Sequence, residues 1–291
     1  METMVGKAIG EIQSIRPFLK WAGSKRLILS TLAGYWSDDF ERYIEPFAGS
    51  SSLFFYLQPK RAILGDINSD LIETYKQIKH NVDDVSSDLA RMTKGKDEYY
   101  RIRSIDIKTL SPSQRAARFI YLNKLSFNGL YRTNQKGVFN VPFGGEKAGP
   151  VPTKESLQRC SKALQRVQLF SGDFGLVLER AQPGDFVYLD PPYSVKSRRI
   201  FNEYDKSSFS TAELKRLRQW LDKLTKLGVV FLLSYAKSSE AKLLMDGYPT
   251  KEINVRRNIA GFSQYRRNAK EWLASNRDLL NERKNVSEKN R

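Results

Sequence analysis

The chain contains the tetrapeptide Asp190-Pro191-Pro192-Tyr193, whose residue types could hold a flat base that carries an amine. It directly follows the apolar run Phe186–Leu189, which we predict to be a buried strand, and open α/β sheets bind ligands at the carboxyl ends of their strands. Each proline fixes φ and removes a backbone donor, leaving a carbonyl that can only accept. The turn thus offers a carboxylate, acceptor carbonyls and a ring. A structural turn with Asp190 as a cap is the simpler alternative.

A segment near the start of the chain, residues 17–25, could contact a ligand as well. Trp21 offers a stacking surface, Gly23 allows the backbone to approach closely, and Lys25 supplies a cation. On its own this segment could equally be a loop that enters a helix and packs its tryptophan.

A tight turn from strand to helix is expected at residues 45–51, which read Glu-Pro-Phe-Ala-Gly-Ser-Ser. Phe47 and Gly49 lie between the strand-like run Tyr43–Glu45 and an apolar helical stretch. The turn lacks the Gly-Lys-Ser/Thr ending of a phosphate loop and the repeated glycines of a dinucleotide fingerprint. We therefore expect an adenosine cofactor without a pyrophosphate, bound against a helix N-terminus.

Two more acids follow strand-like runs. Asp66 could accept hydrogen bonds from ribose hydroxyls, or it could cap the helix that follows. Asp173, after the run Val167–Ser171, could bind the amine of the cofactor's adenine.

The elements that must position these residues alternate between strands and helices, which predicts an α/β fold with a mostly parallel, Rossmann-like sheet. The clearest helix is expected at 211–227, with leucines on one face and a capping box from Ser210 to Glu213. Strands are expected at Tyr43–Glu45, 61–64, Val167–Ser171, Phe186–Leu189, 229–234 and 253–256.

Residues 76–165 break this alternation, and we interpret them as a helical insertion that carries a β-hairpin at 127–143. The predicted domains are therefore a catalytic, cofactor-binding domain formed by 1–75 and 166–275, and a target-recognition insertion at 76–165. Residues 276–291 are polar and charged and are expected to form a flexible tail.

Composition points to a polyanionic partner. The 291 residues carry a formal net charge of +17, and neutralising phosphates releases condensed counterions. Solubility is the alternative reason for such a charge. The single cysteine excludes an internal disulfide, and with a single histidine it argues against a zinc site. No signal peptide or membrane span is visible, so we expect a cytoplasmic, nucleoid-associated protein without membrane or metal partners.

Six motifs in order resemble those of the Dam-type DNA adenine methyltransferases, and the resemblance spans about residues 17 to 273. They are 18–25 (Phe-Leu-Lys-Trp-Ala-Gly-Ser-Lys), 45–49 (Glu-Pro-Phe-Ala-Gly), 66–71 (Asp-Ile-Asn-Ser-Asp-Leu), 127–130 (Phe-Asn-Gly-Leu), 139–144 (Phe-Asn-Val-Pro-Phe-Gly) and 190–193. The resemblance implies S-adenosylmethionine as cofactor and transfer of its methyl group to adenine N6 in double-stranded DNA, at GATC or a related short site, by base flipping.

The resemblance also implies roles for individual residues. The catalytic residues would be Asp190, Pro191, Pro192 and Tyr193. The cofactor would contact Trp21, Gly23, Lys25, Phe47, Gly49, Asp66, Asp173 and Asp190. DNA would contact Lys20, Asn128, Leu130, Arg132, Asn134 and Pro142.

Two departures from the family pattern bear on these expectations. The glycine motif usually ends in a second glycine, where this chain has Ser51, a small residue that should still fit. Gly145 and Glu146 stand where the best-known GATC methylases have basic residues nearby, which leaves the exact target open.

Two other functions stay open at this point. One is methylation of another exocyclic amine, in cytosine or in an RNA base; the other is a non-catalytic DNA-binding component. Methylation of cytosine carbon-5 is disfavoured, because it needs a cysteine nucleophile and Cys160 lies in an expected helix. The sequence leaves open whether the enzyme acts alone or with a restriction endonuclease, and in what oligomeric state.

Overall fold

The computed structural model describes residues 14–21, 23, 25–192, 209–256 and 268–277. Tyr193 and most of the expected tail lie outside these residues. So do several basic residues that contribute to the net positive charge, among them Lys196, Arg198, Arg199, Arg257, Arg266 and Arg267.

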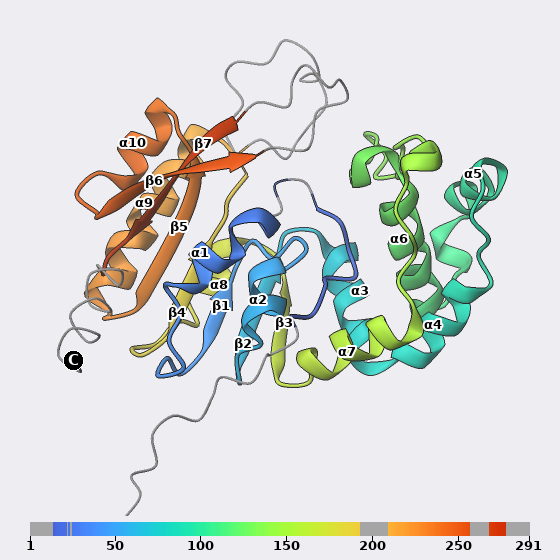
Figure 1. Cartoon of the computed structure of the whole chain (residues 1–291), viewed down its shortest axis with the longest axis horizontal. Helices are drawn as coiled ribbons and strands as arrows, with labels where there is room; N and C mark the ends of the chain where they lie inside the picture. Colours follow the sequence, from blue (N-terminus) through green and yellow to red (C-terminus); the bar gives the residue numbers. More distant parts are fainter. Residues whose placement is uncertain (1–13, 22, 24, 193–208, 257–267, 278–291) are drawn as a thin grey trace, which may run out of the picture.

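A seven-stranded sheet in the order β3-β2-β1-β4-β5-β7-β6 forms the centre of the described structure (Figure 1). The first five of these strands run parallel, and β7 is antiparallel to both β5 and β6. The prediction of a mostly parallel α/β sheet is therefore confirmed. The strands are β1 (Tyr43–Glu45), β2 (Ala62–Asp66), β3 (Val167–Ser171), β4 (Phe186–Leu189), β5 (Val230–Ala236), β6 (Thr250–Arg256) and β7 (Asn268–Ser275).

Strands β1, β3 and β4 have the predicted bounds, whereas the other predictions differ in detail. The prediction for β2 stopped at Leu64, because Gly65 and Asp66 are poor strand formers. In the structure both residues pair with β3 and extend the ladder. Strands β5 and β6 are longer than predicted, and β7 was not predicted.

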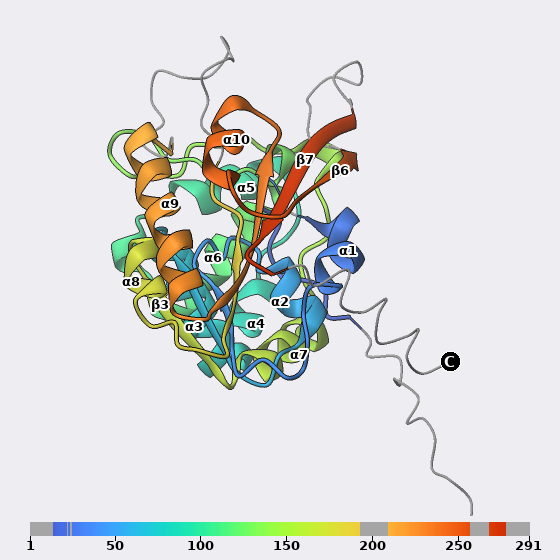
Figure 2. The ribbon, with the colours of Figure 1, turned by 90° about the vertical axis from the view of Figure 1, so that its left-hand side faces the viewer.

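Helices cover both faces of the sheet. On one face, α1 (Leu29–Ala33), α2 (Ser52–Leu57) and α3 (Ser69–His80) pack against side chains such as Tyr43 and Tyr188. On the other face, α8 (Phe174–Leu178), α9 (Thr211–Lys226) and α10 (Ser239–Met245) pack against Ile44 and Val187 (Figure 2). Since neighbouring residues of one strand point to opposite faces, these two cores are separated by the sheet.

The leucine face of α9 is confirmed, but its capping box is half formed. The Ser210 hydroxyl accepts a hydrogen bond from the Glu213 amide, as predicted. The Glu213 carboxylate pairs instead with Arg216, one turn further along the helix.

The expected insertion contains four helices beside the β3 edge of the sheet, α4 (Val82–Ala90), α5 (Lys96–Ser104), α6 (Pro112–Leu125) and α7 (Lys154–Leu164) (Figure 1). Their buried side chains belong to the same continuous core as those of α1 to α3. The expected boundary after residue 75 falls inside α3, and the division into domains stays a prediction.

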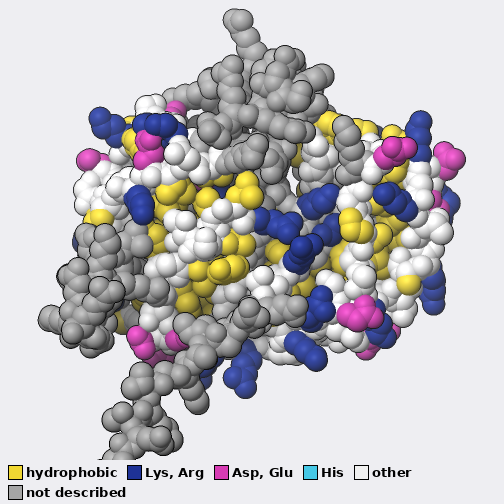
Figure 3. Space-filling view, viewed as in Figure 1, with side chains coloured by type: hydrophobic (Ala, Val, Ile, Leu, Met, Phe, Trp, Pro, Cys, Tyr) yellow, Lys and Arg dark blue, Asp and Glu magenta, His cyan; other side chains and the backbone are white. Residues whose placement is uncertain are grey.

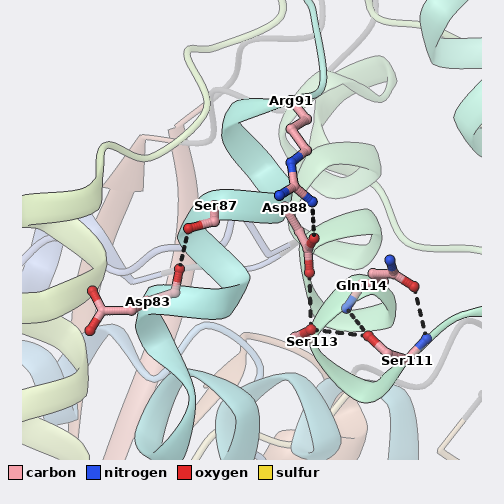
Figure 4. Close-up of polar contacts among 7 residues, drawn as sticks. All are labelled: Asp83, Ser87, Asp88, Arg91, Ser111, Ser113 and Gln114. Atoms are coloured by element: carbon pink, nitrogen blue, oxygen red, sulfur yellow. Dashed lines mark hydrogen bonds and ion pairs between the residues drawn. The ribbon is translucent and has the colours of Figure 1, made fainter.

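A polar network fixes the start of α6 against α4 (Figure 4). Ser111 and Gln114 form a reciprocal capping box, in which each side chain accepts from the other's backbone amide. Ser113 donates to Asp88 Oδ2 at 2.9 Å, and Asp88 also pairs with Arg91 at 3.2 Å. These contacts hold the N-terminus of α6, whose other end leads into the expected hairpin.

The expected hairpin turns at residues 134–137, but its ladder is interrupted. Two isolated bridges, Ser126↔Phe143 and Thr133↔Phe139, connect its arms. Between them Phe127–Gly129 forms a short 3-10 turn (η3), with Asn128 in the left-handed region at φ 56°. A turn of this kind cannot continue a strand, so the arms are held by side chains and single backbone bonds.

Candidate active site

The candidate site lies at the carboxyl edge of the sheet, where β1 and β4 run side by side. From β1 the chain goes on to β2 and β3 on one side, and from β4 to β5 on the other. The connections after β1 and β4 therefore diverge, and this switch point is where open α/β sheets bind ligands. Gly49 follows β1 and Asp190 follows β4, so the fold brings these two predicted residues together.

Asp190 is held by a buried lysine. Lys25 Nζ lies 2.8 Å from Asp190 Oδ1 and 3.5 Å from Glu271 Oε2, a carboxylate on β7. Lys25 and Glu271 are 5% and 3% exposed, whereas the Asp190 side chain is 20% exposed. Lys25 also donates to the carbonyl of Gly23 at 3.3 Å. The predicted residues Gly23, Lys25 and Asp190 thus form one unit.

A serine orients the same carboxylate. Ser234 Oγ, on β5, lies 3.1 Å from Asp190 Oδ1 and 3.2 Å from the Tyr188 hydroxyl. Burial raises the pKa of the Asp190 carboxyl, while the charge and hydrogen bond of Lys25 lower it. Both contacts use Oδ1, and within the described residues Oδ2 has no hydrogen-bond donor. Oδ2 therefore keeps its full capacity to accept a hydrogen bond.

A second acid at this edge, Glu45, is buried. It ends β1, is 3% exposed, and accepts a hydrogen bond from the Tyr43 hydroxyl at 3.1 Å. Burial raises the pKa of the Glu45 carboxyl well above its ordinary value, and the charges of Asp190 and Asp66 raise it further.

Asp66 closes the turn after β1 from the neighbouring strand. Its Oδ2 accepts from the Gly49 amide at 2.9 Å, and its Oδ1 accepts from the Asn68 amide at 3.0 Å. Burial raises the pKa of Asp66, while the backbone amides of Asn68 and Gly49 oppose this change. Each oxygen retains a second lone pair for a ligand hydroxyl. Next to it, Ile67 is 79% exposed, an apolar side chain that our sequence interpretation did not single out.

Trp21 packs directly over Gly49. A Cβ built on Gly49 would lie 2.6 Å from Trp21 Cδ1, so this position leaves no room for a side chain. The indole stacks on Phe119 of α6 and on Tyr131 of the expected hairpin, with ring centroids 6.5 and 5.8 Å apart. Trp21 therefore joins the turn after β1 to the inserted helices.

Asp173 and Phe47 lie at the same carboxyl edge but have structural partners. Asp173 accepts from the Gly175 amide at 2.8 Å, which caps α8, and it pairs with Arg216. Phe47 is partly exposed and contacts the ring of Phe174, at 5.2 Å between centroids. Asp173 also lines a concavity with Gly172 and Leu176.

Lys20 is fixed at the base of the expected hairpin. The side chain of Asn123, a buried residue of α6, bonds both the amide and the carbonyl of Lys20, at 2.8 and 2.7 Å. Asn123 is a further residue that our sequence interpretation missed.

Figure 3 shows Lys and Arg side chains gathered between the sheet and the inserted helices. Burial, together with the charges of Lys20 and Arg26, lowers the pKa of Lys124 to about 8.

The remaining predicted DNA contacts lie on or beside the hairpin, and most are exposed. Arg132 is exposed and donates to Asn140 Oδ1 at 2.8 Å. The Asn134 side chain is committed to the turn, where it accepts from the amides of Lys136 and Val138. Asn128 and Pro142 are exposed and Leu130 is partly buried. Two exposed apolar residues in this hairpin were not predicted as contacts, Phe127 (42%) and Val138 (52%).

Within the described residues, no cluster of three or more His, Cys, Asp or Glu side chains could hold a metal ion. No helix in the described ranges is both long enough and apolar enough to cross a membrane.

The comparisons with known proteins agree with one another. Residues 21–259 match the family described as D12 class N6 adenine-specific DNA methyltransferase. The type II methyltransferase M1.LlaDCHI of Lactococcus lactis subsp. cremoris is 35% identical, over 90% of this chain and 96% of its own. Type II methyltransferase M.MjaIII of Methanocaldococcus jannaschii is 35% identical over 84% and 93%. The DNA adenine methylase of Escherichia coli K12 is 32% identical over 89% and 94%.

Proposed function

Since the chain belongs to the D12 class of N6 adenine-specific DNA methyltransferases, we propose that it uses S-adenosylmethionine and duplex DNA at the edge built from Lys25, Gly49 and Asp190. The observation that carries this proposal is the Lys25–Asp190 pair at the switch point between β1 and β4. GATC, or a short site related to it, is the proposed target, because the order of the six motifs resembles that of the Dam-type enzymes.

The residues at the carboxyl edge fit the proposed cofactor. An adenosine needs an apolar surface for its ring and an acceptor for its ribose hydroxyls. Ile67 and Asp66 supply both in adjacent positions, with Trp21 over the turn at Gly49. When bound, the cofactor supplies a methyl group already activated by its sulfonium centre. Trp21, Gly23, Lys25, Phe47, Gly49, Asp66 and Asp173 are the proposed contacts.

Asp190 and the Pro191 carbonyl act on the other reactant. The lone pair of adenine N6 is delocalised into the ring, which makes the amine a poor nucleophile. Acceptors that hold the amine hydrogens favour a more localised lone pair. Asp190 Oδ2 is suited to this role because Lys25 and Ser234 engage Oδ1. Pro192 stiffens the turn, and Tyr193, outside the described residues, is proposed to stack on the base.

Alignment of the two reactants makes the largest contribution to the rate. Well-oriented reactants gain on the order of 7 to 11 kcal/mol of the barrier. The fold provides such orientation because Gly49 and Asp190 follow neighbouring parallel strands, so that cofactor and base meet over one edge.

DNA is proposed to bind between the sheet and the inserted helices, with the target adenine flipped out. Flipping costs a few kcal/mol of lost stacking and pairing. The exposed side chains of Phe127 and Val138 could fill the space that the flipped adenine leaves in the duplex. Lys20, Lys124 and Arg26 could contact phosphates. Asn128, Leu130, Arg132, Asn134 and Pro142 are the other proposed contacts.

Transfer of tritium from labelled S-adenosylmethionine to unmodified duplex DNA, followed by nucleoside analysis and mapping, tests the proposal. We expect the label in N6-methyladenine within one short sequence. Label in cytosine would keep the fold and overturn the base assignment. No label in DNA, with cofactor binding intact, would point to RNA as the substrate. Absence of cofactor binding in a calorimetric titration with S-adenosylmethionine would favour a non-catalytic DNA-binding protein. Cytosine carbon-5 chemistry is disfavoured, because Cys160 is buried in α7 and burial raises its pKa to about 12.

Arg132 is proposed to read a guanine through two hydrogen bonds, since its exposed guanidinium is already oriented by Asn140. A good contact of this kind discriminates by about 1–3 kcal/mol, or roughly 5- to 150-fold. Arg132→Ala should therefore relax the preference among substituted sites by this factor, with a smaller loss of non-specific binding. Arg91→Ala, at another exposed arginine, is the control. Equal preference in Arg132→Ala and the parent would reject direct readout.

A restriction endonuclease that cuts the same sequence is a further proposed partner, because two relatives are named type II methyltransferases. DNA methylated by the enzyme should resist such a nuclease, and continued cutting would contradict the pairing.

A further inference from the structure

Tyr131 lies between the proposed cofactor contacts and the proposed DNA contacts. It sits in the expected hairpin, between Leu130 and Arg132, and is partly buried. Its ring stacks on Trp21, with centroids 5.8 Å apart and planes at 21°. The Tyr131 ring also contacts the rings of Phe119 in α6 and Phe139 in the opposite arm of the hairpin, with centroid distances of 5.0 and 5.6 Å.

The hydroxyl of Tyr131 reaches a third element. It donates to Asp70 Oδ2 at 3.0 Å, in the first turn of α3. That turn begins at Asn68, whose amide donates to Asp66, the proposed ribose acceptor. Burial raises the pKa of the Tyr131 hydroxyl, and Asp70 raises it further, so that the group stays a donor.

These contacts join both proposed sites through one side chain. On the cofactor side, Trp21 packs over Gly49 and stacks on Tyr131. Asp66 accepts from the Asn68 amide at the start of α3, and Asp70 in the same turn accepts from the Tyr131 hydroxyl. From the DNA side, Phe139 holds the returning arm, whose Asn140 orients Arg132. A ligand that orders Trp21 or the start of α3 therefore also orders the hairpin, and the converse holds.

We propose that Tyr131 is a positioning residue that couples the cofactor pocket to the DNA-reading hairpin, so that each ligand tightens binding of the other. The proposal rests on the proposed cofactor and DNA sites. Coupling between two sites is reciprocal, and typical values begin at about fivefold. We expect S-adenosylhomocysteine to tighten DNA binding about 5- to 10-fold, and DNA to tighten its binding by the same factor.

The experiment measures this factor in both directions. Affinity for a labelled duplex carrying the mapped methylation sequence is measured with and without saturating S-adenosylhomocysteine, and calorimetry gives the reverse pair. In Tyr131→Leu the factor should fall close to one, with smaller changes in affinity for each ligand alone. Tyr131→Phe keeps the rings and loses only the bond to Asp70, so an intermediate factor is expected. A loss of packing alone would weaken both affinities and leave the factor unchanged.

Tyr248 provides a matched control outside the hairpin. Its hydroxyl donates to Asp222 at 2.7 Å and its ring contacts Phe231, so Tyr248→Phe removes a similar bond. Coupling should be unaltered in this variant.

Should Tyr131→Leu fail to fold, Tyr131→Phe and Asp70→Ala decide the question, because each removes the hydrogen bond between the Tyr131 hydroxyl and the Asp70 carboxylate. They should reduce the factor alike, and the double variant should lose no more than either. A parental factor in these variants, or no coupling in the parent protein, would overturn the inference. Absence of methyl transfer by the parent protein would instead overturn the proposed function.

Discussion

Strand β4 has an aspartate at each end, and the two are held in opposite ways. Before the strand, Asp185 is 1% exposed and receives both a 2.9 Å bond from Arg42 Nε and a 2.6 Å bond from Arg42 Nη2. After the strand, Asp190 is 20% exposed and meets the single ammonium of Lys25. At the amino end the acid is buried and its cation is 20% exposed, whereas at the carboxyl end the cation is the buried partner.

The difference separates an ion pair whose carboxylate is fully occupied from one whose carboxylate can accept a further partner. A guanidinium is a rigid fork that matches both oxygens of a carboxylate, whereas an ammonium is a point charge whose donors rotate. Arg42 occupies both oxygens of Asp185, and Asp185 Oδ2 also accepts from the Gln182 amide. Lys25 engages one oxygen of Asp190 and is shared with Glu271. The amino end is therefore saturated, while the carboxyl end can accept a further partner.

Among the variants that test this contrast, Asp190→Asn should cause the largest change, a loss of kcat. The amide keeps the shape of the side chain but removes the charge and one acceptor, and loss of such a group costs roughly 10³-fold in kcat. Stability should change little, because the amide oxygen can still accept from Lys25 and Ser234, and Glu271 remains as an anionic partner of Lys25. Single-turnover methyl transfer at saturating cofactor measures the effect. Turnover within about tenfold of the parent would contradict the assigned role.

Asp185→Ala should do the reverse, with loss of stability and preserved chemistry. Breaking a buried ion pair by removing one partner costs about 3 to 5 kcal/mol, and the partial exposure of Arg42 favours the lower end. Urea unfolding followed by circular dichroism measures the loss, and methyl transfer per folded molecule at low temperature should match the parent. Asp83→Ala, which breaks the exposed pair with Lys154, is the control and should not move the midpoint measurably. A small loss in Asp185→Ala would remove the distinction between the two ends.

Lys25→Gln tests the same comparison through the pH dependence of kcat. In the proposed role, the ionised Asp190 carboxylate is the stronger acceptor of the amine hydrogens, so activity should rise with pH through its pKa. Lys25 lowers that pKa and Glu271 raises it, and burial has the largest effect. Removing the Lys25 charge must therefore raise the pKa and move the acidic limb of the kcat profile to higher pH. Lys237→Gln, in the exposed pair with Glu252, should leave the limb in place. An unmoved limb in Lys25→Gln would mean that another group controls it.

Much of the carboxyl edge could be predicted from the sequence for one physical reason. Parallel strands end at the same edge, so acids that end or follow β2, β3 and β4 must lie along that edge. Asp66, Asp173 and Asp190 do so, and the apolar runs before two of them had the right bounds. The family resemblance placed Lys25 at the same site, and the structure pairs it with Asp190.

Contacts between distant segments could not be predicted in this way. Glu271 reaches Lys25 because β7 pairs with β5 in an antiparallel sense, and nothing local marks that pairing. The one sequence feature that could have indicated Glu271 is its position as an acid directly before a short apolar stretch that contains Leu273 and Ala274. Tyr131 meets Trp21 only because α6 carries the hairpin back over the turn at Gly49, which is a consequence of tertiary packing.

Ser51→Gly should give the smallest effect and tests the departure from the family's glycine motif. Ser51 has φ 45°, in the left-handed region that favours glycine, yet its hydroxyl donates to the Ala48 carbonyl at 3.3 Å. Glycine would relieve strain of about 1–2 kcal/mol, but it also adds roughly 0.4–1 kcal/mol of chain entropy to the unfolded state. The free energy of unfolding should therefore change by less than about 1 kcal/mol, with cofactor affinity within about twofold of the parent.

The neighbouring Gly49 provides the contrast for Ser51→Gly. Gly49 also has positive φ, but a Cβ there would overlap Trp21, so Gly49→Ala should weaken cofactor binding while Ser51→Gly does not. Calorimetric titration of both variants with S-adenosylhomocysteine compares them. A strong gain in affinity from Ser51→Gly would mean that the serine limits the pocket. Equal affinities in all three proteins would mean that close packing of Trp21 over the turn has no part in holding the cofactor, and that the sites at the carboxyl edge work independently of it.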